Sequence, residues 1–383
     1  MSGKKVKIAV VGVGGMGSGH CKSLPTIEEC ELTAVVDVNP DQARRVGEEC
    51  GVPYFTDYRK VLRKKGLAEA VVIATPHYFH PPIAIAALRA GLHVLSEKPI
   101  GVQISQAEKM VAAAKASGKV FCVMFQMRTE AHTKKAKELV ETGELGEIRR
   151  TMLVSPEYRS QAYYDSGTWR ATWGGEGGGV MMNQAPHIMD VFTMLGGMPK
   201  RVHGRIATVL HDIEVEDQAE AMLEYENGAA GYFYVATSEM GRRFVEIVGD
   251  KGKLRLEGDT LRFWRYSTSV SQFTVVNTEM WGSPKMEEVE LKVQPCENGH
   301  RVILRNFARA ILYGEPLISP GEVGLKGLEL ANAITLSSYD GKPVDLPINR
   351  ARFDRLIKRL KATSSFKDDW GETKAETDPD TQK

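Results

Sequence analysis

The sequence predicts an α/β protein of two domains, the first built on a doubly wound parallel sheet and the second of α+β type. The chain has 383 residues, more than one ordinary domain holds. Up to about residue 126, apolar β-rich runs alternate with helical stretches. Beyond that point, alternating polar and apolar runs follow one another with turn residues between them.

The first domain, residues 1–126, is predicted from the way strands and helices alternate. Strands separated by helical crossovers pair in parallel with right-handed connections, which gives a doubly wound sheet. The predicted strands are 7–13, 32–37, 70–74, 93–96 and 120–125, and the helices between them include 41–50, 82–90 and 105–116.

The second domain, residues 127–363, is predicted to hold a mainly antiparallel sheet. Turn signals such as Glu226-Asn227-Gly228 separate its alternating runs. The clearest strands are 219–225, 229–236, 244–248 and 260–266, with helices at 131–142, 299–313 and 321–338. Residues 364–383 are polar and charged, so we expect a disordered tail there.

A glycine-rich turn follows the first predicted strand and opens a helix. It reads Gly12-Val13-Gly14-Gly15-Met16-Gly17, and Asp37 ends the second strand about 20 residues further on. This strand–turn–helix context is what distinguishes a dinucleotide-binding Rossmann signature from a simple glycine turn. The Asp37 carboxylate suits ribose hydroxyls and repels a 2′-phosphate, which favours NAD over NADP.

Composition and charge exclude several other classes of protein. Lys and Arg total 50 against 49 for Asp and Glu, which leaves no excess of cations for nucleic-acid phosphates. No apolar run approaches the roughly 20 residues of a membrane span. The five cysteines are scattered without metal-ligand spacing, so we predict reduced thiols, a cytoplasmic location and no metal site.

Glu97-Lys98-Pro99 comes directly after the predicted strand at 93–96. Carboxyl ends of strands in an open α/β sheet face the ligand crevice. A lysine at that place can bind a substrate hydroxyl and share in proton transfer. An isolated lysine would more often be a solvated surface charge, so the functional interpretation of Lys98 depends on its place at the end of a strand.

The linked motifs resemble those of the Gfo/Idh/MocA oxidoreductases. They are the glycine signature, Thr75-Pro76 with His80, and the run from Ala90 to Pro99. The resemblance extends to about residue 360 and implies a nicotinamide-binding domain followed by a domain whose large open sheet forms oligomer contacts. It also implies that Lys98 is the catalytic lysine and that the chain is a homo-oligomer, dimer or tetramer.

The second motif of that family begins at Gly177-Gly178-Gly179 and continues to Asn183, His187 and Asp190. Its spacing predicts that these three polar side chains share one helix face. Better-known relatives have Asp where this chain has Asn183, and an amide can hold a sugar hydroxyl but cannot act as a base. His187 is therefore the expected general base, against the alternative of a buried helix histidine. Asp190 either orients His187 or only packs.

An aromatic segment between the two motifs suits a sugar, which has apolar C–H faces and a hydroxylated rim. It contains Tyr158, Tyr163, Tyr164, Trp169 and Trp173, and core packing is the alternative for each of them. Trp169-Arg170 matches a pair that lies near cofactor and substrate in relatives. Gln126 and Arg128 match cleft positions, although Arg128 could instead form a domain-interface ion pair.

Together these interpretations give one expected site. The catalytic residues are Lys98, His187 and Asn183. The expected cofactor contacts are Gly12, Gly14, Gly15, Met16, Gly17, Asp37, Thr75, Pro76, His80, Glu97, Lys98, Trp169 and Arg170. The expected substrate contacts are Lys98, Gln126, Arg128, Tyr163, Trp173, Asn183 and His187.

The expected activity is an NAD-dependent dehydrogenase for a secondary hydroxyl of a sugar, glycoside or cyclitol, with C3 of a glucoside a preferred position by resemblance. One alternative is glycoside cleavage through transient C3 oxidation. The other is a non-catalytic dinucleotide or sugar sensor. His77 and His80 imitate a metal pair without the pattern of a known site, and His80 is interpreted as structural or cofactor-adjacent. Residues 211–217 are interpreted as an exposed strand entry, and His300, which opens a C-terminal helix, is a further candidate for the cleft.

Overall fold

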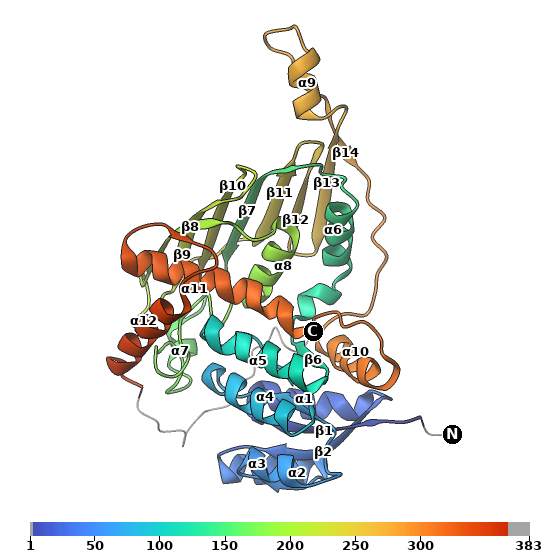
Figure 1. Cartoon of the computed structure of the whole chain (residues 1–383), viewed down its shortest axis with the longest axis vertical. Helices are drawn as coiled ribbons and strands as arrows, with labels where there is room; N and C mark the ends of the chain where they lie inside the picture. Colours follow the sequence, from blue (N-terminus) through green and yellow to red (C-terminus); the bar gives the residue numbers. More distant parts are fainter. Residues whose placement is uncertain (1–2, 367–383) are drawn as a thin grey trace.

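The computed structural model of the chain describes residues 3–366, which form two sheets, one in each half of the molecule (Figure 1). The predicted tail lies outside the described residues from position 367 onward. Within the described part, none of the helices has the length and apolar character needed to cross a membrane.

The first sheet has six parallel strands in the order β3-β2-β1-β4-β5-β6, so the predicted doubly wound fold is confirmed. Its strands are β1 (Val6–Val11), β2 (Cys30–Val36), β3 (Tyr54–Phe55), β4 (Ala70–Ile73), β5 (His93–Ser96) and β6 (Phe121–Val123). Its helices are α1 (Gly15–Ser23), α2 (Pro40–Cys50), α3 (Tyr58–Arg63), α4 (His80–Arg89) and α5 (Ile104–Ser117). The strand order reverses between β1 and β4, which is where ligands bind in such sheets.

Local sequence explains where these helices begin and end. The Asn39 side chain caps α2 by accepting hydrogen bonds from the amides of Asp41 and Gln42. Gly51 ends the same helix in the left-handed conformation, which suits glycine. Pro40 at the first helical position has no amide to leave unsatisfied.

The second sheet has nine strands in the order β14-β13-β12-β11-β7-β10-β9-β8-β15. They are β7 (Ile148–Pro156), β8 (Arg201–Ala207), β9 (Gln218–Glu224), β10 (Ala230–Ala236), β11 (Phe244–Gly249), β12 (Gly252–Glu257), β13 (Thr260–Tyr266), β14 (Met286–Val289) and β15 (Val344–Asp345). All pairs are antiparallel except β7 with β10, so the mainly antiparallel sheet is confirmed.

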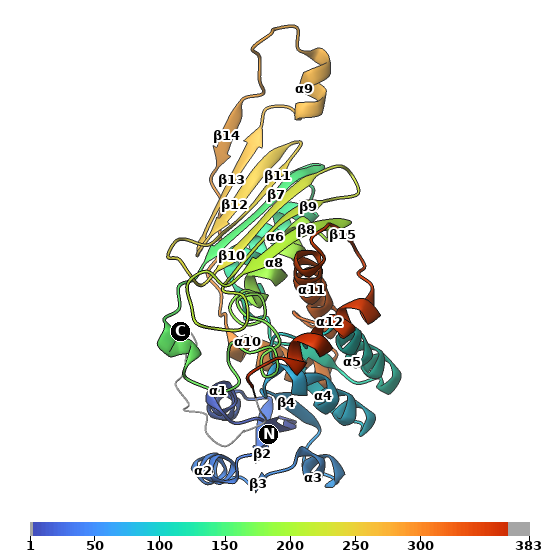
Figure 2. The same ribbon diagram turned by 90° about the vertical axis from the view of Figure 1, so that its left-hand side faces the viewer.

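Helices cover one face of this sheet, and the other face is open to the surroundings in the described chain (Figure 2). The covering helices include α6 (Ala131–Glu141), α8 (Pro186–Gly196) and α11 (Gly324–Asp340). Gly204 on β8 lets α11 lie close, because a Cβ there would stand 2.9 Å from the Cα of Ile334. Helix α12 (Arg350–Ala362), which follows its cap Asn349, was not predicted.

The chain returns to the first sheet after completing most of the second. Helix α10 (His300–Tyr313) buries Ile303, Leu304 and Phe307 against the face of β1 that carries Val6 and Ile8. The following segment runs beside β6, where Val123 donates a backbone hydrogen bond to Ser319. Residues assigned by sequence to the second domain therefore complete the core of the first.

The segment between β13 and β14 extends beyond the end of the large sheet (Figure 1). It contains α9 (Val270–Val276), which has no buried residue. Its apolar side chains include Val275, Met280 and Trp281, which are 83%, 85% and 90% exposed.

Candidate active site

The glycine turn between β1 and α1 leaves room for a phosphate-bearing ligand. Gly12 has a positive φ of 83°, and a Cβ on Gly17 would lie 1.8 Å from the Gly12 carbonyl oxygen. A Cβ on Gly14, in contrast, would meet nothing within 4 Å. Gly15 and Met16 begin α1, so its first amides face that open space. Such a helix N-terminus is a ready anion site.

Asp37 lies one residue beyond β2 with its carboxylate fixed by backbone amides. Oδ2 accepts from Val13 at 2.9 Å and Oδ1 accepts from Asn39 at 2.9 Å. The Asp37 side chain is thus joined to the glycine turn at Val13. This arrangement fits a dinucleotide whose pyrophosphate lies on the turn and whose ribose lies on the carboxylate.

The loop after β4 places Thr75 and Pro76 beside the same turn. Thr75 Oγ1 is buried and has no hydrogen-bond partner among residues 3–366. His80 is fully buried, with its ring nitrogens 2.8 Å and 2.6 Å from the carbonyl oxygens of Pro99 and Thr75. His80 therefore connects the Thr75 loop to the segment after β5.

Glu97 is buried and contacts a residue that sequence analysis did not single out. His20 on α1 is 2% exposed, and its Nε2 lies 2.7 Å from Glu97 Oε1. Burial opposes ionisation of Glu97, but the hydrogen bond with His20 and the charges around it lower the pKa of this carboxyl. The only sequence signal for His20 was its place three residues after Gly17. The ring of His300, at the start of α10, packs beside His20, with 5.8 Å between the two ring centroids.

Lys98 connects the first domain to the second. Its Nζ donates a hydrogen bond of 3.0 Å to the backbone oxygen of Asn183. Burial lowers the pKa of Lys98, while the carboxylates of Glu97 and Glu176 oppose that effect. The motif after β5 and the motif before α8 therefore lie in contact.

His187, in the first turn of α8, lies beside Gln126, the first residue of the short 3-10 helix that follows β6. Its Nε2 is 3.1 Å from Gln126 Nε2, and its ring contacts Phe125 edge to face. His187 Nδ1 and Gln126 Oε1 are buried without a partner in the described chain. Burial, followed by the charge of Lys98, holds the pKa of His187 well below its ordinary value. The imidazole is therefore neutral at neutral pH and can accept a proton.

The predicted shared helix face for Asn183, His187 and Asp190 is wrong. Helix α8 begins at Pro186, so Asn183 lies in the preceding turn, where its backbone N–H donates to the Gly179 carbonyl oxygen. Proline at the first helical position and the glycine run before it explain the late start.

Asp190 and Arg128 form an ion pair with each other. Arg128 Nε and Nη2 donate to the two carboxylate oxygens of Asp190 at 2.6 Å and 2.7 Å. Asp190 therefore does not orient His187, which corrects one of the two roles considered for it. Arg128 was expected among the substrate contacts, but this geometry fits the alternative of an ion pair between elements.

The aromatic segment divides into a part near the site and a part in the core. Arg170 lies over the rings of Tyr163 and Trp169, at 4.6 Å and 5.0 Å, and donates to the Tyr163 hydroxyl. Trp173 is 6% exposed, and its indole nitrogen donates to the Glu214 carbonyl at 3.0 Å. Trp173 therefore packs in the core, and its burial leaves little of the ring surface for the substrate contact that was expected there.

Residues 211–217 are also more buried than expected. Asp217 is fully buried and accepts hydrogen bonds from the amides of Val209, Leu210 and His211 and from the His211 ring. The interpretation as an exposed strand entry is wrong, because one carboxylate organises a tight turn here.

Within residues 3–366 no group of three or more His, Cys, Asp or Glu is arranged to hold a metal ion.

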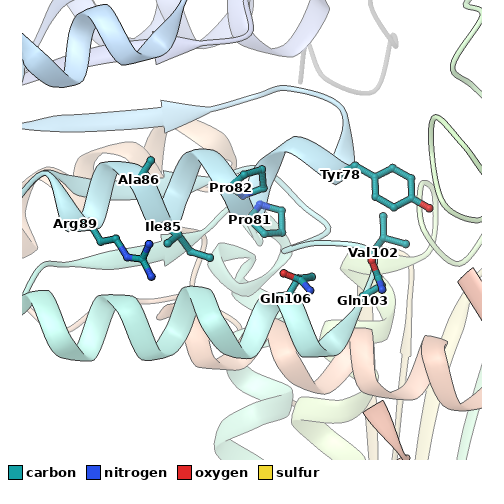
Figure 3. Close-up of a pocket in the computed structure, with 9 residues that line it drawn as sticks. All are labelled: Tyr78, Pro81, Pro82, Ile85, Ala86, Arg89, Val102, Gln103 and Gln106. Carbon is teal, nitrogen blue, oxygen red and sulfur yellow. The ribbon is translucent and has the colours of Figure 1, made fainter. Parts of the chain in front are cut away.

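A separate groove of about 500 Å³ lies between α4 and α5 (Figure 3). Its lining includes Tyr78, Pro82, Ile85 and Arg89. None of the residues expected to bind cofactor or substrate lines it, so it is distinct from the site around Lys98.

The fold and the site define a class of protein: a dinucleotide-binding domain whose strand ends are faced by a second α+β domain. A sequence profile described as "Oxidoreductase family, NAD-binding Rossmann fold" matches residues 6–125. A second, described as "GFO/IDH/MocA C-terminal domain", matches residues 133–255. The chain belongs to the Gfo/Idh/MocA family of NAD-binding oxidoreductases.

Distant relatives cover nearly the whole chain. Myo-inositol 2-dehydrogenase of Thermotoga maritima is 25% identical over 354 residues, which are 89% of this chain and 98% of the relative. The scyllo-inositol 2-dehydrogenase (NAD(+)) of Bacillus subtilis is 26% identical over 357 residues, 91% of this chain and 98% of the relative.

Solved structures have the same fold. The WlbA dehydrogenase of Bordetella pertussis in complex with NADH and UDP-GlcNAcA has a TM-score of 0.78 at 28% identity, covering 90% of this chain and all of that one. A levoglucosan dehydrogenase with NADH has a TM-score of 0.75 at 21% identity, covering 90% of this chain and 100% of that one, a similarity of fold alone.

Proposed function

We propose that the protein is an NAD-dependent dehydrogenase that oxidises a secondary hydroxyl of a sugar, glycoside or cyclitol. The observation that carries the proposal is that Lys98, just beyond β5, donates to Asn183 and also lies close enough for its charge to lower the pKa of His187. The inositol dehydrogenases among its relatives and the sugar nucleotide bound to WlbA support this class of substrate.

The residues present fit a dinucleotide, because open space lies over Gly14 and the buried Thr75 Oγ1 has no partner in the described chain. In the proposed complex, the glycine turn binds the pyrophosphate and Asp37 the adenosine ribose. NAD, when bound, supplies the hydride acceptor.

The chain's own residues would manage the proton. Neutral His187 accepts the proton of the substrate hydroxyl, and the Lys98 ammonium stabilises the developing negative charge on that oxygen. Asn183 holds a hydroxyl of the substrate. The aromatic surface of Trp169 and Tyr163, with Arg170 over it, borders the sugar and excludes water.

The proposal is tested by following NADH absorbance with purified protein, excess NAD and a panel of inositols, free hexoses and glucosides. A steady rise with one group of substrates is the expected result. Release of aglycone without net NADH would instead establish the redox-assisted cleavage of glycosides. Tight NAD binding with neither reaction, in either direction, would favour the sensor.

The pH dependence of this reaction follows from the pKa shifts at the site. Protonation of His187 removes the base, and burial lowers its pKa well below 6.5, so this loss moves to lower pH. Burial also lowers the pKa of Lys98 from 10.5, so loss of the ammonium begins at lower pH than for an ordinary lysine. We expect kcat/KM to be flat through neutral pH, with its acid limb below pH 6.5. An acid limb of kcat/KM at or above pH 6.5 would contradict the assignment of His187 as the base.

Asp37 is predicted to set the preference for NAD over NADP. Asp37→Asn removes the charge that repels a 2′-phosphate and weakens the hydrogen bonds to the ribose. We expect NADH to bind about 10- to 100-fold more weakly and NADPH to bind more tightly, as measured by fluorescence titration. Asp41→Asn, on the exposed first turn of α2, is the matched control. Equal affinity of the unaltered protein for both dinucleotides would refute the prediction.

We also propose that the open face of the large sheet pairs with a second copy of the chain. Met222 and Tyr232 lie directly opposite each other on β9 and β10 and are 60% and 42% exposed. Met222→Glu and Tyr232→Glu are expected to yield monomers in light scattering after size-exclusion chromatography. Tyr313→Glu on α10, also exposed, should leave the assembly unchanged. A monomeric parent protein would exclude this proposal.

A further inference from the structure

A buried carboxylate that the proposed chemistry does not use lies behind the candidate site. Glu176 is 1% exposed, and no Lys, Arg or His within the described chain forms an ion pair with it. Its Oε2 accepts from the amide of Ala171 at 2.7 Å, and its Oε1 accepts from Asn183 Nδ2. Burial raises the pKa of Glu176, and the charge of Arg170, the two hydrogen bonds and the charge of Lys98 oppose that effect.

Glu176 joins the two segments that border the site. Ala171 has a positive φ of 53°, which is strained for a residue with a side chain, and it follows Trp169 and Arg170 directly. Its amide is held by one oxygen of Glu176, and the Asn183 side chain is held by the other. A single carboxylate therefore fixes the end of the aromatic segment and the side-chain amide of the residue whose backbone oxygen accepts from Lys98.

The hydrogen bond between Glu176 and Asn183 also fixes the orientation of the Asn183 side-chain amide. In its ionised form, Glu176 accepts two N–H groups and offers no donor, so only the nitrogen of Asn183 can face it. The amides of Gln126 and Gln184 lack such a constraint, because their partners are an imidazole and a hydroxyl that can donate or accept. Asn183 Oδ1 is left as a pure acceptor, and no hydrogen bond to it is present within residues 3–366.

This acceptor lies next to the expected reacting centre, since Lys98 Nζ donates to the backbone oxygen of the same asparagine. We infer that Glu176 is a positioning residue that holds the Asn183 amide with its oxygen toward the substrate, and thereby selects substrates with a second hydroxyl beside the carbon that is oxidised. The inference rests on the proposed function. A substrate with a keto, ether or deoxy carbon at that neighbouring position offers no donor to Oδ1.

The test combines Glu176→Gln with the removal of one substrate hydroxyl. The best substrate from the panel is compared with its two deoxy analogues, each lacking one hydroxyl that flanks the oxidised carbon. In the parent enzyme one analogue should lose about 10- to 100-fold in kcat/KM, the cost of leaving a buried acceptor unpaired. In Glu176→Gln the amide of residue 176 can donate to a turned Asn183, so intact and deoxy substrates should differ less than about threefold.

Glu216→Gln is the matched control. Glu216 is 2% exposed and accepts from the Met181 amide at 3.2 Å, so it supports the same turn without touching Asn183. This variant should keep the ratio between intact and deoxy substrates. NADH binding, measured by fluorescence, should be unchanged in both variants because neither residue contacts the glycine turn.

The outcomes separate the inference from the proposed function. A parent enzyme that oxidises polyols, with the same intact-to-deoxy ratio in Glu176→Gln, would overturn the inference and leave the function standing. A parent enzyme that oxidises no polyol would overturn the function, and the inference with it. If Glu176→Gln does not fold, Glu176→Asp takes its place, since it withdraws the carboxylate by one methylene and should lower the ratio in the same way.

Discussion

Lys98→Met is expected to abolish NADH formation while leaving NADH binding nearly unchanged. The lysine lies at the end of β5, where its Nζ donates to the Asn183 carbonyl from within a partly buried site. Methionine fills similar space but carries no charge and no proton. Loss of such a group lowers kcat by about 100- to 10,000-fold, which stopped-flow measurement of the first turnover would detect.

The control for this substitution is Lys60→Met on α3, which removes an exposed lysine from the same domain. It should retain full activity. If Lys98→Met kept more than about a tenth of the parent kcat, a catalytic role for Lys98 would be excluded. If instead it lost NADH binding, the lysine would serve the dinucleotide rather than the proton.

Gly17→Ala is expected to prevent the first domain from folding stably. The added Cβ would lie 1.8 Å from the backbone oxygen of Gly12, a clash that no rotation of a side chain can relieve. We expect a loss of more than about 3 kcal/mol, since it combines overpacking with backbone strain. Thermal unfolding followed by circular dichroism measures this effect.

Gly19→Ala, two residues further along α1, is the matched control. A Cβ there meets nothing within 4 Å, and alanine is favoured over glycine inside a helix by about 1 kcal/mol. It should unfold at the same temperature as the parent or slightly higher. A Gly17→Ala variant as stable as Gly19→Ala would show that α1 can move away from the glycine turn.

Much of the first domain could be predicted from the sequence because its signals are local. The glycine turn, the acidic residue after β2 and the alternation of strands and helices each occupy a short stretch of chain. The same holds for four strands of the second sheet, β9, β10, β11 and β13, which were predicted within a residue or two, whereas β7, β8, β12, β14 and β15 were not given bounds. Helix α12 also had a local signal, an Asn349 cap followed by apolar residues at helical spacing, which the sequence analysis overlooked.

The parts of the site that could not be predicted depend on contacts between distant residues. The pairing of His20 with Glu97 joins positions 77 residues apart, and that of Arg128 with Asp190 joins positions 62 apart. No spacing rule connects such positions, because their distance is set by how the strands are ordered in the sheet. The shared helix face of Asn183 and His187, in contrast, was a local error, since Pro186 between them was a visible sign of a helix start.

The return of α10 to the first sheet limits how the protein can be dissected. A fragment ending at residue 126 would contain every strand of the dinucleotide-binding sheet yet lack Ile303, Leu304 and Phe307, which cover one of its apolar faces. Val6 and Ile8, both fully buried in the whole chain, would be uncovered in it. A stable version of this half needs residues 299–321 attached as well, so its folding unit is assembled from two separate stretches of sequence.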